Sequence, residues 1–379
     1  MICEPIPFFG AQREWAAHAE QLRGPIEAAL ASGRWLEGDP VAAFERELAA
    51  RCGRAHAVSV GSGTDALFFA LRALGLGQGD EVLVPDFSFV ATATAVVRAG
   101  ARPVWTDVDE DGLLDLGDAA ARVGPRTAAV IAVSLFGRPL DTAAAEAFAD
   151  RHGLALLEDA AQALGASACG RPAGAVGVAA SVSFDPTKPV AAPGSGGAVL
   201  TDDDALARAC LRLRCHGREG GGPSAVLGYN SRLATISAAA LLVKLSLEPS
   251  WRASRTRVAD AYEAAVECVE GLTPPGRSAG CEHAYSKYVV RVDGGPKVRT
   301  ALATALQRAG VTTQVHYRLP LHAHPVFADR PPAGGAPPQA AALTQRVLSL
   351  PIHPFLRADE VQRVTCALTT EAPRTARPS

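Results

Sequence analysis

The stretch AHAVSVGSGTDALFFALRALGLGQGDEVLVPDFSFVATATAVVRA, residues 55–99, decides the fold. It opens with a short apolar run at 55–60, typical of a strand, and continues with the apolar spacing of a helix at 64–74. After a Gly-rich break the pattern repeats, with a strand at 81–84 and a helix at 89–99. This alternation is typical of an α/β protein with a largely parallel sheet.

The same pattern extends to both sides of this stretch. Apolar runs predict further strands at 103–106, 128–133 and 155–157, with helical segments between them. Two helical patterns precede the stretch, at 13–31 and 41–52. We therefore expect one large sheet with helices packed on it.

The length of the chain predicts two domains, because a single core usually stops growing at about 250–300 residues and this chain has 379. We place the large domain at residues 1–248 and a smaller C-terminal domain at residues 249–379, with a frayed tail from about residue 369. The elements expected around and beyond this boundary are helices at 235–247, 251–268 and 298–309 and a strand near 287–292.

Composition excludes several classes of function. The net charge of −2 and the absence of a basic stripe argue against a nucleic-acid partner. The eight cysteines form no C-x-x-C pair, so we expect no metal site, and cysteines that are mostly free and buried. We find no signal peptide and no segment suited to spanning a membrane, and we expect a cytoplasmic enzyme.

Gly61-Ser62-Gly63-Thr64 is the first motif that suggests chemistry, because it joins a strand to a helix. Backbone N–H groups and the helix dipole at such a junction suit a phosphate. The competing interpretation is a capped turn, for which Ser, Thr and Gly are also common.

Glu158 and Asp159 follow an apolar strand, and ligand-binding groups in open α/β sheets gather at the carboxyl ends of strands. A carboxylate at this place could hold the pyridine nitrogen of a pyridoxal cofactor protonated. Helix capping by Asp159 is the alternative.

Lys188 stands between an apolar strand and a Gly-rich turn. Desolvation at such a place would lower the pKa of the amine and favour the neutral form that attacks an aldehyde. The alternative is an exposed loop lysine. Phe87 and Phe89 could each stack on a cofactor ring or pack in the core.

Taken in this order, the motifs resemble those of the DegT/DnrJ/EryC1/StrS family, the sugar aminotransferases of pyridoxal-phosphate (PLP) fold type I. The resemblance runs from about Gly33 to Leu356. Its strongest pieces are GSGTDAL at 61–67, GDEVLVPDFSFVATATAV at 79–96, EDAAQALGA at 158–166, SFDPTK at 183–188 and GYNSRL at 228–233. Weaker pieces are HYRLPLHAHPVF at 316–327 and LSLPIHP at 348–354.

The resemblance implies a large domain with a mostly parallel mixed sheet sandwiched by helices, plus a smaller C-terminal α/β domain. It implies that Lys188 carries PLP as a Schiff base and moves the substrate proton. Asp159 is similar to the partner of the pyridine nitrogen, Gln162 to the residue near the phenolic oxygen, and Phe89 to the aromatic residue on the ring.

The resemblance also implies a phosphate cradle made by Gly63, Thr64 and Ser183. Asn230 matches a residue that reaches this phosphate from the partner subunit, which implies a homodimer with shared active sites.

Three positions depart from the family pattern: Ser134 and Leu164 stand where histidine is common, and Pro189 opens a replacement of the usual Asn-Leu-Gly. We expect all three near the substrate pocket, where they leave the identity of the substrate open.

The expected activity is transfer of an amino group from glutamate or glutamine to a keto group of a nucleotide-linked sugar, in secondary-metabolite or polysaccharide amino-sugar biosynthesis. A keto-cyclitol or other non-nucleotide acceptor is an open alternative, and so is a non-catalytic regulator that binds PLP or a sugar. Arg232, His316, Tyr317 and His322 are either substrate contacts or ordinary polar residues.

Overall fold

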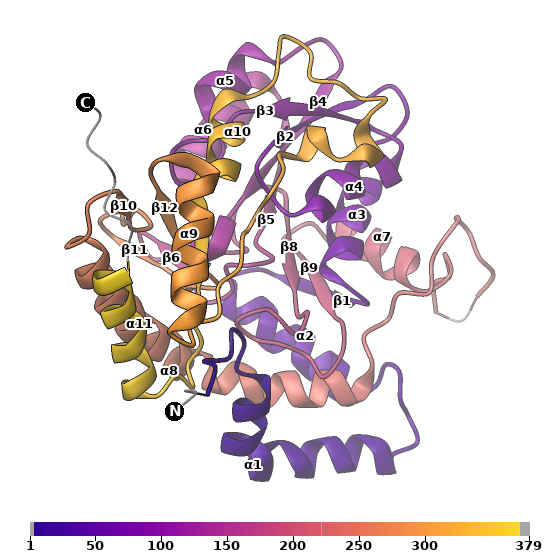
Figure 1. Cartoon of the computed structure of the whole chain (residues 1–379). Coiled ribbons are helices and arrows are strands. Elements are labelled where there is room, and N and C mark those ends of the chain that lie inside the picture. The colour runs from indigo at the N-terminus through magenta and orange to yellow at the C-terminus, as the bar shows by residue number, and fades with distance from the viewer. Residues whose placement is uncertain (1–3, 221, 372–379) are drawn as a thin grey trace.

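The computed structural model describes residues 4–220 and 222–371, and its centre is a seven-stranded sheet (Figure 1). The strand order is β1-β9-β8-β5-β4-β2-β3, and β9 runs antiparallel to both of its neighbours. The sheet is therefore mostly parallel and mixed, as predicted. The strands are β1 (His56–Val60), β2 (Glu81–Pro85), β3 (Arg102–Thr106), β4 (Thr127–Val133), β5 (Ala155–Asp159), β8 (Ala179–Ser183) and β9 (Gly197–Thr201).

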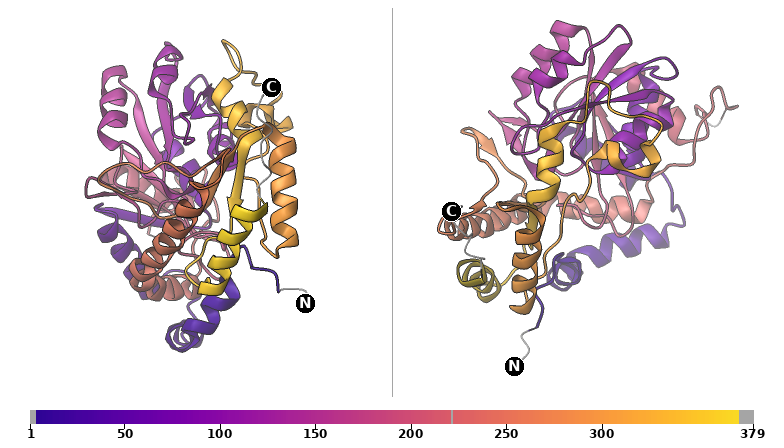
Figure 2. Two further views of the ribbon diagram at one scale, coloured as in Figure 1. Left: turned by 60° about the vertical axis from the view of Figure 1, so that its left-hand side comes forward. Right: turned by 45° about the horizontal axis from the view of Figure 1, so that its top comes forward.

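Helices lie on both sides of this sheet, as the left-hand view of Figure 2 shows. A sheet covered on both faces buries successive residues of each strand, which explains the apolar run of β4 and the unbroken burial of β8. The helices of this half of the chain are α1 (Ala11–Ala31), α2 (Asp39–Arg51), α3 (Gly63–Ala73), α4 (Val90–Ala99), α5 (Leu116–Ala121), α6 (Thr142–His152) and α7 (Asp204–Arg214).

A second, antiparallel sheet forms the smaller α/β part of the chain, in the order β10-β12-β13. Its apolar core also includes Ile6, from the other end of the sequence. The elements of this part are β10 (Leu272–Thr273), β12 (Tyr288–Val292), α9 (Gly295–Arg308), α10 (Pro338–Arg346), β13 (Val347–Leu350) and α11 (Ala358–Glu371). A third small sheet joins β6 (Ser167–Ala168), β7 (Arg171–Pro172) and β11 (Cys281–Glu282).

A single helix, α8 (Thr235–Val266), replaces the two helices predicted at 235–247 and 251–268. It continues through Pro249, although proline removes one helical hydrogen bond. The helix is held on both sides of this residue, because Leu245 packs in the core beside the large sheet and Tyr262 packs in the core of the second sheet. The domain boundary at 248/249 falls inside α8 and stays a prediction.

The segment before β13 packs back on the large sheet. Phe327 and Leu343 belong to the same apolar core as β2 and β4, and the rings of Phe327 and Trp105 lie 5.2 Å apart. Asp107 accepts hydrogen bonds from the N–H groups of Gln339 and Ala340 at the start of α10. Part of the predicted small domain is thus held against the large sheet.

Two smaller expectations need correction. Helix α11 continues to Glu371, so fraying from residue 369 is wrong for 369–371, and 372–379 lie outside the described residues. The seven described cysteines are free, but only Cys52 and Cys210 are buried. Among the helices of residues 4–220 and 222–371, none is long and apolar enough to cross a membrane.

Candidate active site

A cavity of about 450 Å³ lies at the edge of the large sheet where the parallel strands end, and we call it the main cavity. Parallel strands deliver their following residues to one edge, which brings distant parts of the sequence together. Of the twelve residues predicted for the site, nine line this cavity: Gly63, Thr64, Phe89, Asp159, Gln162, Ser183, Lys188, His316 and Tyr317.

The first wall of the main cavity is the N-terminus of α3, where the first backbone N–H groups have no partner inside the helix. Ser62 caps this helix by accepting a hydrogen bond from the Asp65 N–H at 3.1 Å. A Cβ atom on Gly63 would lie only 2.6 Å from the Cβ of Ser183, and one on Gly197 only 2.4 Å from the carbonyl carbon of Ser62. The two glycines therefore allow strands and helix to close into a cradle that suits an anion.

Asp159 ends β5 and holds a fixed carboxylate in the cavity wall. It accepts hydrogen bonds from Thr92 Oγ1 at 2.8 Å, from the Ala161 N–H at 3.2 Å and from Ser181 Oγ at 3.4 Å. Among the residues that the structure describes, no cationic side chain forms an ion pair with it. The carboxylate is thus oriented by neutral donors and is available to a cationic group of a ligand.

Lys188 lies in the turn between β8 and β9 and lines the main cavity. Burial lowers the pKa of its amine, and the neighbouring carboxylates of Asp159 and Asp185 oppose this shift only in part. The neutral form, which is the nucleophile, is therefore more accessible than in an exposed lysine.

Gln162 and Tyr317 close another side of the cavity. Gln162 accepts a hydrogen bond from the Phe136 N–H at 3.0 Å and donates one to Tyr317 Oη at 3.1 Å. Burial raises the pKa of Tyr317, so its hydroxyl stays protonated. The ring of Phe89 lies 6.2 Å from that of Tyr317 and is 50% exposed, whereas Phe87 is buried in the core.

Three predicted residues lie outside the main cavity of their own chain. Asn230 is exposed and accepts a hydrogen bond from Arg232, which also pairs with Glu37. Both lie in the segment between α7 and α8, after the loop that projects from the body of the molecule (Figure 1), and Asn230 pairs with Cys215 in an isolated β-bridge. His322 binds Asp86, donating its N–H to that carboxylate at 2.8 Å, so it anchors the loop to the end of β2. Neither Arg232 nor His322 lines the main cavity of its own chain, so the structure of one chain does not support a substrate contact by either residue.

None of the three departures from the family pattern lines the main cavity, so direct substrate contacts there are not supported, although Pro189 follows Lys188 in the chain. Ser134 is buried and donates a hydrogen bond to Glu158 at 2.7 Å. Leu164 packs in an apolar core. Pro189 lines a different cavity.

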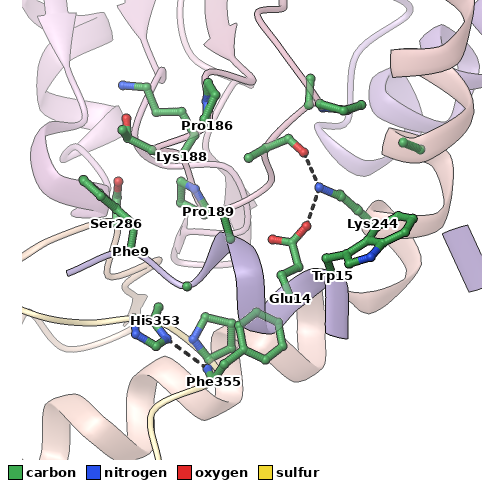
Figure 3. A pocket seen from close by; sticks show the side chains of 18 of the residues that line it. Phe9, Glu14, Trp15, Pro186, Lys188, Pro189, Lys244, Ser286, His353 and Phe355 are labelled. Atoms are coloured by element: carbon green, nitrogen blue, oxygen red, sulfur yellow. Dashed lines mark hydrogen bonds and ion pairs between the residues drawn. The ribbon is translucent and has the colours of Figure 1, made fainter. Parts of the chain in front are cut away.

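That second cavity, of about 320 Å³, lies between α1 and the turn at 186–194. Lys244 crosses it, pairing with Glu14 and donating to the carbonyl of Ala191 at 2.6 Å. Figure 3 shows the amine of Lys188 pointing away from this pair. We therefore place the chemistry in the main cavity, where Asp159 and the start of α3 also lie.

Lys287 and Phe9 line the main cavity and were missed by the sequence analysis. Lys287 directly precedes β12, and Phe9 precedes α1, so no local motif connects either of them with Lys188. The available signal was that Lys287 is one of four lysines in the chain and stands beside an apolar strand.

The model of the DegT/DnrJ/EryC1/StrS aminotransferase family matches residues 17–369. The chain belongs to this family. The assignment agrees with the resemblance carried by the five motifs and with the lysine and carboxylate that meet in the main cavity.

Relatives of this DegT/DnrJ/EryC1/StrS aminotransferase match it along nearly their whole length. The erythromycin biosynthesis sensory transduction protein EryC1 of Saccharopolyspora erythraea is 43% identical over 97% of this chain and 100% of its own. The dTDP-3-amino-3,4,6-trideoxy-alpha-D-glucose transaminase of Streptomyces venezuelae is 39% identical over 97% of both chains. The crystal structure of S. venezuelae DesV with a ketimine intermediate superposes with a TM-score of 0.94, at 37% identity, over 99% of this chain and 100% of that one.

These matches confirm the predicted fold class, a PLP-type aminotransferase fold, and the predicted enzyme class. This member of the DegT/DnrJ/EryC1/StrS family is an aminotransferase whose relatives include nucleotide-sugar transaminases.

Proposed function

We propose that this enzyme transfers an amino group from glutamate or glutamine to a keto group of a nucleotide-linked sugar, in the cytoplasm and within amino-sugar biosynthesis. The observation that carries the proposal is the convergence of Lys188, Asp159 and the start of α3 on one cavity. The nucleotide-sugar transaminase among its relatives supports the acceptor class.

PLP is the cofactor, as the sequence predicted. When bound, it supplies an aldehyde that exchanges primary amines and a ring that accepts electrons. The residues of the main cavity fit each part of this molecule. The start of α3 with Gly63, Thr64 and Ser183 would hold the phosphate, and Phe89 would stack on the ring.

Asp159 and Lys188 would act on different parts of the cofactor. The fixed carboxylate of Asp159 would hold the proton on the ring nitrogen, since a charged acceptor favours the protonated donor. The amine of Lys188, with its lowered pKa, would attach the cofactor and then remove and return the substrate proton. Both halves of the transfer need this single base, so donor and acceptor would use the cavity in turn.

The test is a panel of acceptors with purified enzyme, PLP and either glutamate or glutamine. The panel contains dTDP- and UDP-linked keto-sugars and keto-cyclitols, and products are identified by mass spectrometry. We expect amination of a sugar nucleotide. Turnover of keto-cyclitols alone would contradict the proposed acceptor. If neither glutamate nor glutamine shifts the visible band of the bound cofactor, the result would favour a non-catalytic regulator that binds PLP.

We also infer that the enzyme is a homodimer in which Asn230 of the partner subunit reaches the phosphate. Asn230 is exposed and lies outside the main cavity of its own chain, in the segment between α7 and α8. The same segment carries Leu227, which is 92% exposed. Val226 and Tyr229 of this segment are exposed as well, and a group of exposed apolar side chains is typical of a surface that another chain covers.

Mixing two defective variants tests this arrangement. Lys188→Ala lacks the base, and Asn230→Asp places a negative charge at the phosphate. If each active site takes Lys188 from one subunit and Asn230 from the other, a mixed dimer has one active site with both residues intact. Statistical reassembly of equal amounts should therefore restore about a quarter of the wild-type rate.

The two variants are unfolded and refolded together, and the control is the same mixture without subunit exchange. The PLP concentration should saturate the wild type but not Asn230→Asp. Absence of any gain after exchange, with mixed dimers present, would show that Asn230 serves its own subunit.

A further inference from the structure

A second lysine, Lys287, enters the main cavity from the start of β12. It is only 7% exposed, and Lys188 lines the same cavity. The mechanism proposed above uses Lys188 and leaves Lys287 without a role.

The hydrogen bonds of Lys287 are incomplete. Its Nζ donates to the carbonyl of Thr187 at 3.3 Å and to that of Ser286 at 3.2 Å, and it lies 5.1 Å from the centre of the Phe9 ring. An ammonium group has three donors. In the part of the chain that the structure describes, no carboxylate lies within ion-pair distance of this amine. A buried charge without a counter-charge is unfavourable, so this site suits an anion from outside the chain.

The surroundings of Lys287 are basic. Lys188 and His316 face it, and the nearby carboxylate of Asp185 is engaged by the N–H and hydroxyl of Thr187 at 3.0 and 2.6 Å. Burial and the charge of Lys188 lower the pKa of Lys287 to about 7, and burial lowers the pKa of His316 to about 4. A bound anion would stabilise the protonated form of Lys287.

The position of Lys287 selects the kind of anion. The cofactor phosphate has its own cradle at Gly63, Thr64 and Ser183. Lys287 instead donates to the carbonyl of Thr187, the residue next to Lys188, so its ligand lies beside the reacting amine. In an α-amino acid the carboxylate is attached to the carbon that bears the transferred amine. A carboxylate of a sugar acid is farther from its keto carbon.

We propose that Lys287 binds the α-carboxylate of the amino donor and so restricts the donor to α-amino acids. This inference rests on the proposed function, and it names the donor-binding residue of that site. The interaction would be a charge-assisted hydrogen bond, which is shorter and stronger than one between neutral groups.

The test compares Lys287→Met, which keeps the shape and removes the charge, with Lys287→Arg and with Lys297→Met. Lys297 is an exposed lysine of α9 and serves as the matched control. With PLP-loaded enzyme, the Kd of glutarate is measured by calorimetry. The Kd of glutamate and glutamine comes from the single-turnover loss of the visible band, and the KM of the keto-sugar nucleotide from steady-state rates.

We expect Lys287→Met to weaken glutarate, glutamate and glutamine by about 10- to 100-fold, the range for a hydrogen bond to a charged group. The KM of the keto-sugar nucleotide should change little. Lys287→Arg should regain most of the donor affinity, and Lys297→Met should match the wild type. In the wild type, glutarate affinity should fall as the pH rises, because burial lowers the pKa of Lys287 and the amine loses its proton earlier than an exposed lysine does. Lys287→Met should remove this slope.

Unchanged glutarate affinity in folded, PLP-loaded Lys287→Met would overturn the inference. The inference would also be overturned if only the KM of the keto-sugar nucleotide rose in Lys287→Met. That result would mean that Lys287 binds a carboxylate of the acceptor. If Lys287→Met does not fold, Lys287→Gln takes its place in the same measurements. A loss of glutarate affinity in an enzyme that aminates no sugar nucleotide would refute the proposed acceptor and leave the role of Lys287 intact.

Discussion

Replacing Lys188 by alanine should abolish the visible band of the Schiff base, which borohydride converts into a permanent bond to the protein, and lower amino transfer by about 10,000-fold, the upper range for loss of one acid–base group. The reason is that the main cavity offers one amine to hold the cofactor covalently and to carry the substrate proton. Lys287, the other lysine of the cavity, is bound to the carbonyl groups of Thr187 and Ser286. The measurements are the absorbance spectrum of the purified variant and kcat with the acceptor identified by the panel.

Lys297→Ala is the control, because it removes an exposed lysine of α9. It should keep both the band and the rate. Added methylamine should restore part of the activity of Lys188→Ala, since a small amine can take the place of the missing base. Wild-type turnover by Lys188→Ala would refute the mechanism.

Replacing Asp159 by asparagine should lower kcat by about 100- to 1,000-fold, the range for removing one preorganised electrostatic group. Asparagine keeps the shape and can still accept the hydrogen bond from Thr92, but it carries no charge to hold the proton on the ring nitrogen. The visible band should persist, because Lys188 is intact. A PLP analogue methylated on the ring nitrogen has a fixed positive charge and should recover part of the rate.

Glu158→Gln is the matched control for Asp159→Asn. Glu158 is the preceding residue of β5, and its carboxylate accepts hydrogen bonds from Ser134 and from the Gly174 and Val176 N–H groups, away from the main cavity. The two backbone N–H groups share one oxygen of Glu158, so the amide can keep its carbonyl oxygen there and turn its NH2 group to the Ser134 hydroxyl, which then accepts. The unfolding free energy should change by no more than about 1 kcal/mol while kcat stays near that of the wild type. Equal losses of kcat in both variants would contradict the assignment to Asp159.

The parts of the site that the sequence predicted share one property: each follows a strand of the large sheet. Gly63 follows β1, Asp159 ends β5 and Lys188 follows β8. The alternation of strands and helices predicts a parallel sheet, and a parallel sheet brings the ends of its strands to one edge. The family resemblance then connected these residues with a cofactor.

The parts that the sequence missed depend on packing between distant segments. Lys287 reaches Thr187 because the second sheet packs beside the large one, and no local pattern records that contact. The continuation of α8 through Pro249 depends on burial of its two halves in different cores, which outweighs the local preference of proline. The pairing of His322 with Asp86 likewise joins segments 236 residues apart.

Helix α8 has a consequence for how the enzyme accommodates reactants of different size. A continuous rod embedded in two cores resists bending at its middle, so the halves of the chain do not swing about residues 248 and 249 as about a hinge. We expect short connections without regular structure to move when the enzyme exchanges a small amino acid for a bulky acceptor. The stretch from His316 to Pro320, between the two sheets, is the first place to look for such movement by hydrogen exchange.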